Sequence, residues 1–82
     1  MTNEQIDHFL TTETLTKVIN INFKTRNSIR GLFLNVSDFE DLKSKNLWRV
    51  ITEARIEDWR KTKDMGLSRI YSGSDFTKLK AQ

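Results

Sequence analysis

Apolar and polar residues alternate along residues 18–24. Ile19, Ile21 and Phe23 share one face, while two asparagines and a lysine occupy the other. A period of two is typical of a half-buried β-strand. A short polar turn at 25–28 leads into a second apolar run, 29–36, in which Gly31 allows a bend or a bulge. The two runs predict a β-hairpin.

The first ten residues have the spacing of a short helix. Ile6, Phe9 and Leu10 fall at i, i+3 and i+4 and form one apolar stripe. Thr2 or Asn3 can accept hydrogen bonds from the first free amides, and acidic residues in the first turn suit the positive end of the helix dipole. So short a helix is unstable alone. We therefore expect a helix over about 3–10 that packs against an open end or face of the sheet.

Three later segments, 47–52, 67–72 and 77–80, have the composition of strands. A polar, charged stretch at 37–46 predicts a loop or a single turn. The sequence Gly73-Ser74-Asp75-Phe76 predicts a tight turn before the last strand. Counted with the hairpin, these segments give five short strands.

Residues 54–63 fit two interpretations. Ile56 and Trp59 lie three apart, and Glu57 and Lys61 form an i,i+4 pair, which favours a helix. At a period of two, the same residues fit only a strand with a bulge. We favour the helix and keep the bulged strand as the alternative.

Five short strands on an 82-residue chain predict an α+β fold with a small, strongly bent antiparallel barrel. Closing or half-closing the sheet removes exposed edges. We expect a single domain over residues 1–82, with a five-stranded SH3/Sm-like barrel over about 16–80 behind the N-terminal helix.

Composition excludes several classes of site. The chain has no cysteine and no proline, so it has no disulfide framework, thiol nucleophile or thiolate metal site. His8 is the single histidine and is interpreted as solvated, so we expect no metal and no cofactor. Adjacent acids such as Glu40 and Asp41 point apart, and no nucleophile–base pair can be assembled. We expect a protein that is not an enzyme.

No signal peptide pattern or membrane-spanning apolar run is visible in the sequence, which predicts a cytoplasmic protein. The net charge of +3 is unevenly spread. Residues 1–15 are acidic, whereas residues 16–35 and 47–82 are basic. A basic surface is compatible with binding phosphate groups, although so small a charge is also ordinary for solubility.

The hairpin and the second half resemble the two sequence motifs of the Sm-like proteins, including the bacterial Hfq-type members. The first motif is similar to residues 21–36 and the second to Ile70-Tyr71-Ser72-Gly73-Ser74-Asp75-Phe76. The resemblance implies a five-stranded barrel behind an N-terminal helix. The positions that hold uracil or its phosphate in that family are Ser37, Asp41 and Ser72 here, in place of Asp, Asn and a basic residue. The resemblance therefore supports a fold and not an inherited RNA site.

Two phrases, Leu47-Trp48-Arg49-Val50 and Ser68-Arg69-Ile70-Tyr71-Ser72-Gly73, also resemble a family of short uncharacterised bacterial proteins, which implies no function.

Two functions are compatible with these residues. The first is a non-catalytic module that binds single-stranded nucleic acid, in particular RNA, through basic and aromatic side chains. Its candidate residues are Lys24, Arg26 and Arg30, with a second strip of Arg49, Trp59, Arg60 and Lys61. The second is a protein-interaction or homo-oligomerisation module, because Trp, Tyr and Arg are also enriched at binding hot spots. No membrane partner is expected.

Overall fold

A computed structural model describes residues 1–81 as one five-stranded antiparallel sheet with three short α-helices. The strands are β1 (Ile19–Phe23), β2 (Ile29–Phe33), β3 (Leu47–Thr52), β4 (Arg69–Ser72) and β5 (Phe76–Ala81). The helices are α1 (Asn3–Phe9), α2 (Phe39–Ser44) and α3 (Ile56–Thr62). Short 3₁₀ turns are η1 (Thr14–Thr16), η2 (Glu53–Arg55), η3 (Met65–Leu67) and η4 (Gly73–Asp75).

The predicted N-terminal helix and hairpin are confirmed. Thr2 caps α1 in a reciprocal capping box, in which its Oγ1 accepts from the Gln5 amide at 3.2 Å and its amide donates to Gln5 Oε1 at 2.9 Å. β1 pairs antiparallel with β2, so that Ile19 lies opposite Gly31 and Ile21 opposite Ile29. The five expected strands are all present, and residues 56–62 form the favoured helix rather than a bulged strand.

Two local details differ from the expectation. The stretch 37–46, predicted as a loop or single turn, contains α2, because Phe39 packs its ring on Trp48 at 5.8 Å between centroids. The irregular register lies between Asn22 and Phe23, where β1 meets β5, and not at Gly31. Gly31 instead allows close packing: a Cβ there would collide with the Val50 side chain and lie 2.8 Å from the Ile51 carbonyl oxygen.

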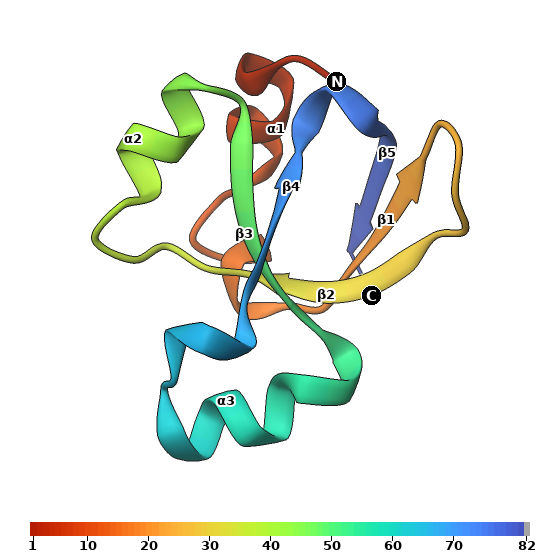
Figure 1. Cartoon of the computed structure of the whole chain (residues 1–82). Helices are drawn as coiled ribbons and strands as arrows, with labels where there is room; N and C mark the ends of the chain where they lie inside the picture. The colour runs from red at the N-terminus through yellow and green to blue at the C-terminus, as the bar shows by residue number, and fades with distance from the viewer. Residues whose placement is uncertain (82) are drawn as a thin grey trace.

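The sheet has the strand order β4-β3-β2-β1-β5. Within residues 1–81 no pairing joins β4 to β5, so the sheet is not closed into a barrel. These two edge strands are nevertheless consecutive in the chain and are joined only by η4. A flat sheet would separate its edges by about 19 Å, whereas one turn of 3₁₀ helix advances only about 2 Å per residue. The sheet must therefore curve strongly so that its edges meet at η4 (Figure 1).

Both faces of the curved sheet are packed, but not equally. The inner face carries the first core, which α1 covers with Ile6 and Leu10; the sheet contributes Ile19, Ile21, Phe33, Trp48, Val50, Phe76 and Leu79. The outer face carries a second core over β2 and β3, built from Leu34, Ile51, Ile56 and Trp59. In Figure 1, α1 and α2 lie at one end of the molecule and α3 at the other.

Asn46 joins the corner at which the edges meet. It follows α2 in the left-handed conformation, with φ of 57°. Its backbone oxygen accepts from the Gly73 amide at 2.8 Å, its Oδ1 accepts from Trp48 Nε1 at 2.8 Å, and its Nδ2 donates to the Met1 carbonyl at 3.0 Å. The backbone and side chain of this one residue thus link β3, η4 and the segment before α1.

Gly73 is packed too tightly at this corner to accept a side chain. An added Cβ would collide with Asn46 Oδ1 and lie 2.5 Å from Ile6 Cδ1. We expect Gly73→Ala to lower the free energy of unfolding by about 1–3 kcal/mol through overpacking, measured by urea denaturation. Gly66→Ala is the matched control, because its Cβ would meet only the Asp64 carboxylate group. Equal effects of the two substitutions would contradict the proposed crowding at Gly73.

Candidate functional site

The outer face of β5, β1 and β2 carries polar and basic side chains. Asn20 of β1 pairs with Lys80 of β5 on one side and with Arg30 of β2 on the other, so these residues form one row across three strands. Asn22 pairs with Lys78 in the next row of β1 and β5. Lys78, Lys80 and Arg30 are all exposed. Residues of one row lie on the same face of a sheet, so the rows define a surface, called here the basic face.

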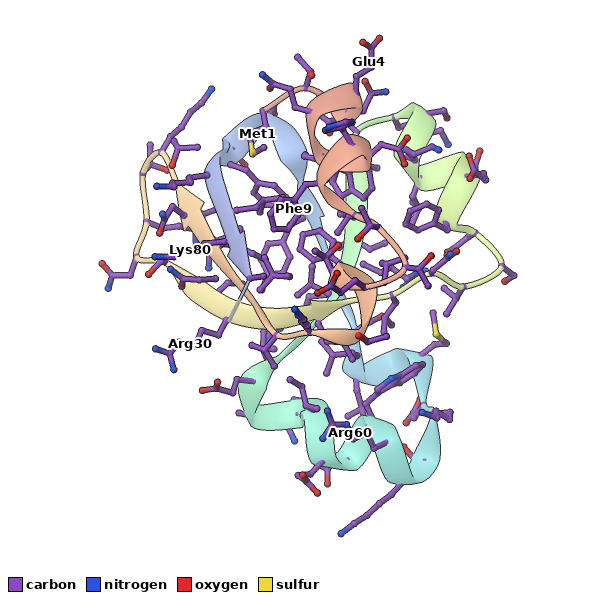
Figure 2. All side chains as sticks on the ribbon, turned by 180° about the vertical axis from the view of Figure 1, so that it is seen from behind. Met1, Glu4, Phe9, Arg30, Arg60 and Lys80 are labelled. Atoms are coloured by element: carbon purple, nitrogen blue, oxygen red, sulfur yellow. The ribbon has the colours of Figure 1, made fainter. Side chains whose placement is uncertain are left out.

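The same outer face changes character where α3 begins to cover it. Leu32 pairs with Ile51, and both pack in the second core with Trp59 of α3. Val18, two residues before Asn20, packs against this core as well. The basic face is therefore the half of the outer surface that α3 leaves uncovered. In Figure 2, Lys80 and Arg30 lie to one side of the sheet, Arg60 lies on α3, and Glu4 projects from α1 at the far end.

Charge is separated between these strands and the rest of the chain. Residues 19–33 and 76–81 contain five basic residues, Lys24, Arg26, Arg30, Lys78 and Lys80, and no Asp or Glu. Because the whole chain has 14 Lys and Arg and 11 Asp and Glu, the other residues hold nine basic and eleven acidic side chains. The excess positive charge of the protein thus belongs to β1, β2, β5 and the β1–β2 turn.

Few acidic residues contact the five basic residues of these strands and the β1–β2 turn. Within residues 1–81 their one ion pair joins Arg30 to Glu53 at 3.9 Å, and both side chains are more than half exposed. Such a pair contributes little in water. Lys24 follows β1, and its amide donates to the Asp75 carbonyl at 2.9 Å, which places it beside the start of β5. Asp75 directly precedes β5, and no acidic residue is nearer in the sequence to the strands of the basic face.

Arg49, predicted as part of a second binding strip, has a structural role. Its Nε donates to Asp38 Oδ1 at 3.2 Å, its Nη2 lies 2.8 Å from Asp38 Oδ2, and its Nη1 donates to Ser68 Oγ at 3.0 Å. This bidentate pair ties the start of α2 to β3 and to the segment before β4. The guanidinium is occupied by protein partners, and we do not include it in the candidate surface.

Of the other residues of that strip, Trp59 is buried, whereas Arg60 and Lys61 are exposed. Trp59 is only 9% exposed and packs in the second core, with Lys63 Nζ 5.3 Å from its ring centroid. Its ring is not available to stack on a base. Arg60 and Lys61 are exposed on α3, where Arg60 lies 3.9 Å from Glu57. The structure does not place these two on the same strands as Lys24, Arg26 and Arg30.

Lys78 and Lys80 are the residues that the sequence interpretation missed. They alternate with Thr77 and Leu79, which places them on one face of a strand. That alternation is visible in the sequence. The pairing of β5 with β1, however, joins residues about 60 apart, and no local pattern reveals that Lys80 lies beside Asn20.

Within residues 1–81 we find no pocket and no cluster of residues that could hold a metal ion. In the same range, no helix combines the length and the apolar character needed to cross a membrane. The basic face is therefore a surface rather than a cleft. Comparison of the chain with known protein families, curated proteins and solved structures finds no match.

The pair of Asp38 and Arg49 makes stability depend on pH. Hydrogen bonding from Arg49 holds the pKa of Asp38 below its ordinary value of 3.8. A lowered folded pKa stabilises the protein above pH 3.8, and this contribution disappears as the pH falls through the folded pKa. We expect Asp38→Asn to lower the urea midpoint at pH 7 and to differ progressively less from the wild type below pH 3.8.

The control for this experiment is Asp41→Asn, because Asp41 forms only an exposed i,i+4 pair with Lys45 at 3.5 Å. It is expected to change the midpoint little at either pH. A difference between Asp38→Asn and the wild type that stays constant from pH 7 to pH 2.5 would show that charge is not the cause.

Proposed function

We propose that this protein is a non-catalytic module that binds single-stranded nucleic acid, with RNA as the first ligand to test, through the basic face. The observation that carries the proposal is the row of Lys80, Asn20 and Arg30, continued by Lys78 and Asn22, on strands without a single acidic residue. Lys and Arg neutralise phosphates, and Asn side chains donate to phosphate oxygens and sugars.

The fold hypothesis that goes with this function is a half-closed barrel of the SH3/Sm type. The strong curvature required by η4 supports it, as does the helix before the first strand. The basic face contains none of the three positions, Ser37, Asp41 and Ser72, that correspond to the uracil site of the Sm-like family; Ser72 lies in β4. Ser37 and Asp41 lie before and within α2, which Figure 1 shows on the opposite side of the molecule from the β1–β2 turn.

One observation favours the second candidate function, a protein partner or self-association. Ile70 lies on the edge strand β4 and is 46% exposed. Within residues 1–81 it is the one large hydrophobic residue that is exposed. An unpaired edge can add a strand from another chain. This surface lies on β4 and is separate from the basic face on β5, β1 and β2.

The nucleic-acid proposal predicts a salt-dependent affinity that Lys78→Gln/Lys80→Gln weakens. Fluorescence anisotropy with a mixed-sequence RNA, at several salt concentrations, gives the slope of log K against log salt. Each lost phosphate contact reduces the magnitude of this slope by about 0.7 for a single strand, so the double variant is expected to lose about 1.4.

The matched control is Lys43→Gln/Lys45→Gln, which removes the same charge from α2, where both lysines pair with acids. It should leave the slope unchanged. Equal losses in the two double variants would mean that only net charge matters, and no binding by the wild type at low salt would reject the function.

The protein-partner candidate predicts self-association that persists at high salt. Size-exclusion chromatography with light scattering, with and without oligonucleotide, should then give a mass above the 9.7 kDa of the single chain, and Ile70→Ser should return it to that value. A mass of one chain at every salt concentration, with a shift only on adding oligonucleotide, would favour the basic face.

A further inference from the structure

Arg26 of the β1–β2 turn lies over a pair of aromatic rings at the end of β1. Phe23 is the last residue of β1 and Tyr71 lies in β4, and their ring centroids are 5.7 Å apart. The Arg26 guanidinium carbon lies 5.2 Å from the Phe23 centroid and 5.8 Å from that of Tyr71. Both rings are partly exposed, and Arg26 is exposed.

The two rings pack against the first core, so they lie on the inner side of the curved sheet, beside the end of β1. Phe23 directly follows Asn22, which pairs with Lys78, and directly precedes Lys24. Its other aromatic neighbour is Phe76 at the start of β5, 5.3 Å away in an edge contact. A strand of nucleic acid that lies along Lys80 and Lys78 on the outer face reaches the two rings by passing around the end of β1, beside Lys24.

We propose that Phe23 and Tyr71 form a stacking position for one nucleobase of a single-stranded nucleic acid, and that Arg26 moves from the rings to the adjacent phosphate when the base enters. This inference rests on the proposed function and deepens it. It assigns the aromatic contact to these rings, in place of the buried Trp59.

The present contacts show that the position accepts a flat, positively charged group. A guanidinium is planar, like a nucleobase, and it is held here only by cation–π contacts at an exposed site, which are weak. Base–aromatic stacking is stronger and depends little on base identity. Exchange of Arg26 for a base leaves the guanidinium free to pair with a phosphate, for which its fork of donors is well suited.

The surrounding charge favours a polyanion. Lys24 and Lys78 are the basic neighbours in the chain and in the sheet, and neither forms an ion pair within residues 1–81. Asp75 is the one acidic neighbour, exposed in η4. Its charge should oppose binding at this end of the face.

The experiment compares two oligonucleotides of equal length, one with bases and one abasic, by anisotropy at fixed salt. The wild type is expected to bind the base-containing strand about 5- to 30-fold more tightly. Tyr71→Leu should lose this preference and keep its salt slope, because the phosphate contacts remain. Tyr71→Phe, which retains the ring, should keep the preference.

Phe39→Leu is the matched control. Phe39 also lies under a basic side chain, with Lys43 Nζ 5.7 Å from its centroid, and it packs against the same core from α2. It should keep the full preference for bases. Arg26→Gln should also keep it, while reducing the salt slope by about 0.7.

The outcomes separate this inference from the function on which it rests. Salt-dependent binding by the wild type without any preference for bases, or a preference that Tyr71→Leu retains, overturns the stacking position and leaves the basic face standing. Failure of the wild type to bind either strand at low salt rejects the proposed function and the stacking position together.

Discussion

The short link between β4 and β5 is the constraint on which the rest of this structure depends. The two strands occupy opposite edges of the sheet, yet only η4 separates them in the chain. The sheet has to bend until its edges meet, and bending creates an enclosed inner face. Asn46 holds the meeting point through its bonds to Gly73, Trp48 and Met1, while Phe23, Tyr71 and Phe76 fill the gap between the edges with rings.

Curvature also determines which surface is left for function. The inner face is filled by the first core and covered by α1. The apolar core of the outer face lies over β2 and β3, where α3 packs. Within residues 1–81, no side chain of β1 or β5 packs in the second core that α3 covers. The uncovered strands hold amide and basic side chains, and the aromatic pair that closes the sheet stands at their end. The curvature of the sheet thus determines where the two cores, the basic face and the proposed stacking position lie.

Local patterns in the sequence predict the strands and two of the three helices. They do not predict which side chains meet on the surface. The alternation of Ile19, Ile21 and Phe23 depends on neighbouring residues and is predicted correctly. The helix cap, expected at Thr2 or Asn3, is Thr2. The segment of α2 is predicted as a loop or a single turn, because the contact of Phe39 with Trp48 follows from the tertiary fold. Arg49 and Trp59 were assigned to a binding strip on residue type alone, whereas their environments are set by Asp38 and by the second core. Lys78 and Lys80 were missed for the same reason, since their row depends on a pairing between distant segments.

The placement of ion pairs is the best argument that the basic face is more than a solvated surface. Six of the nine basic side chains elsewhere in residues 1–81 pair with acids, as in Lys17 with Glu13 and Lys43 with Glu40. An opposite charge across two strands contributes about 0.2–1 kcal/mol to a sheet. On the basic face the cross-strand partners of Lys78, Lys80 and Arg30 are asparagines instead. Glutamate at Asn20 or Asn22 would gain such pairs at no cost in packing, because both side chains lie on the uncovered face. A surface under selection for stability and solubility alone would have mixed charges. One that receives phosphate groups would keep its positive charges unpaired, as these strands do apart from the exposed contact of Arg30 with Glu53.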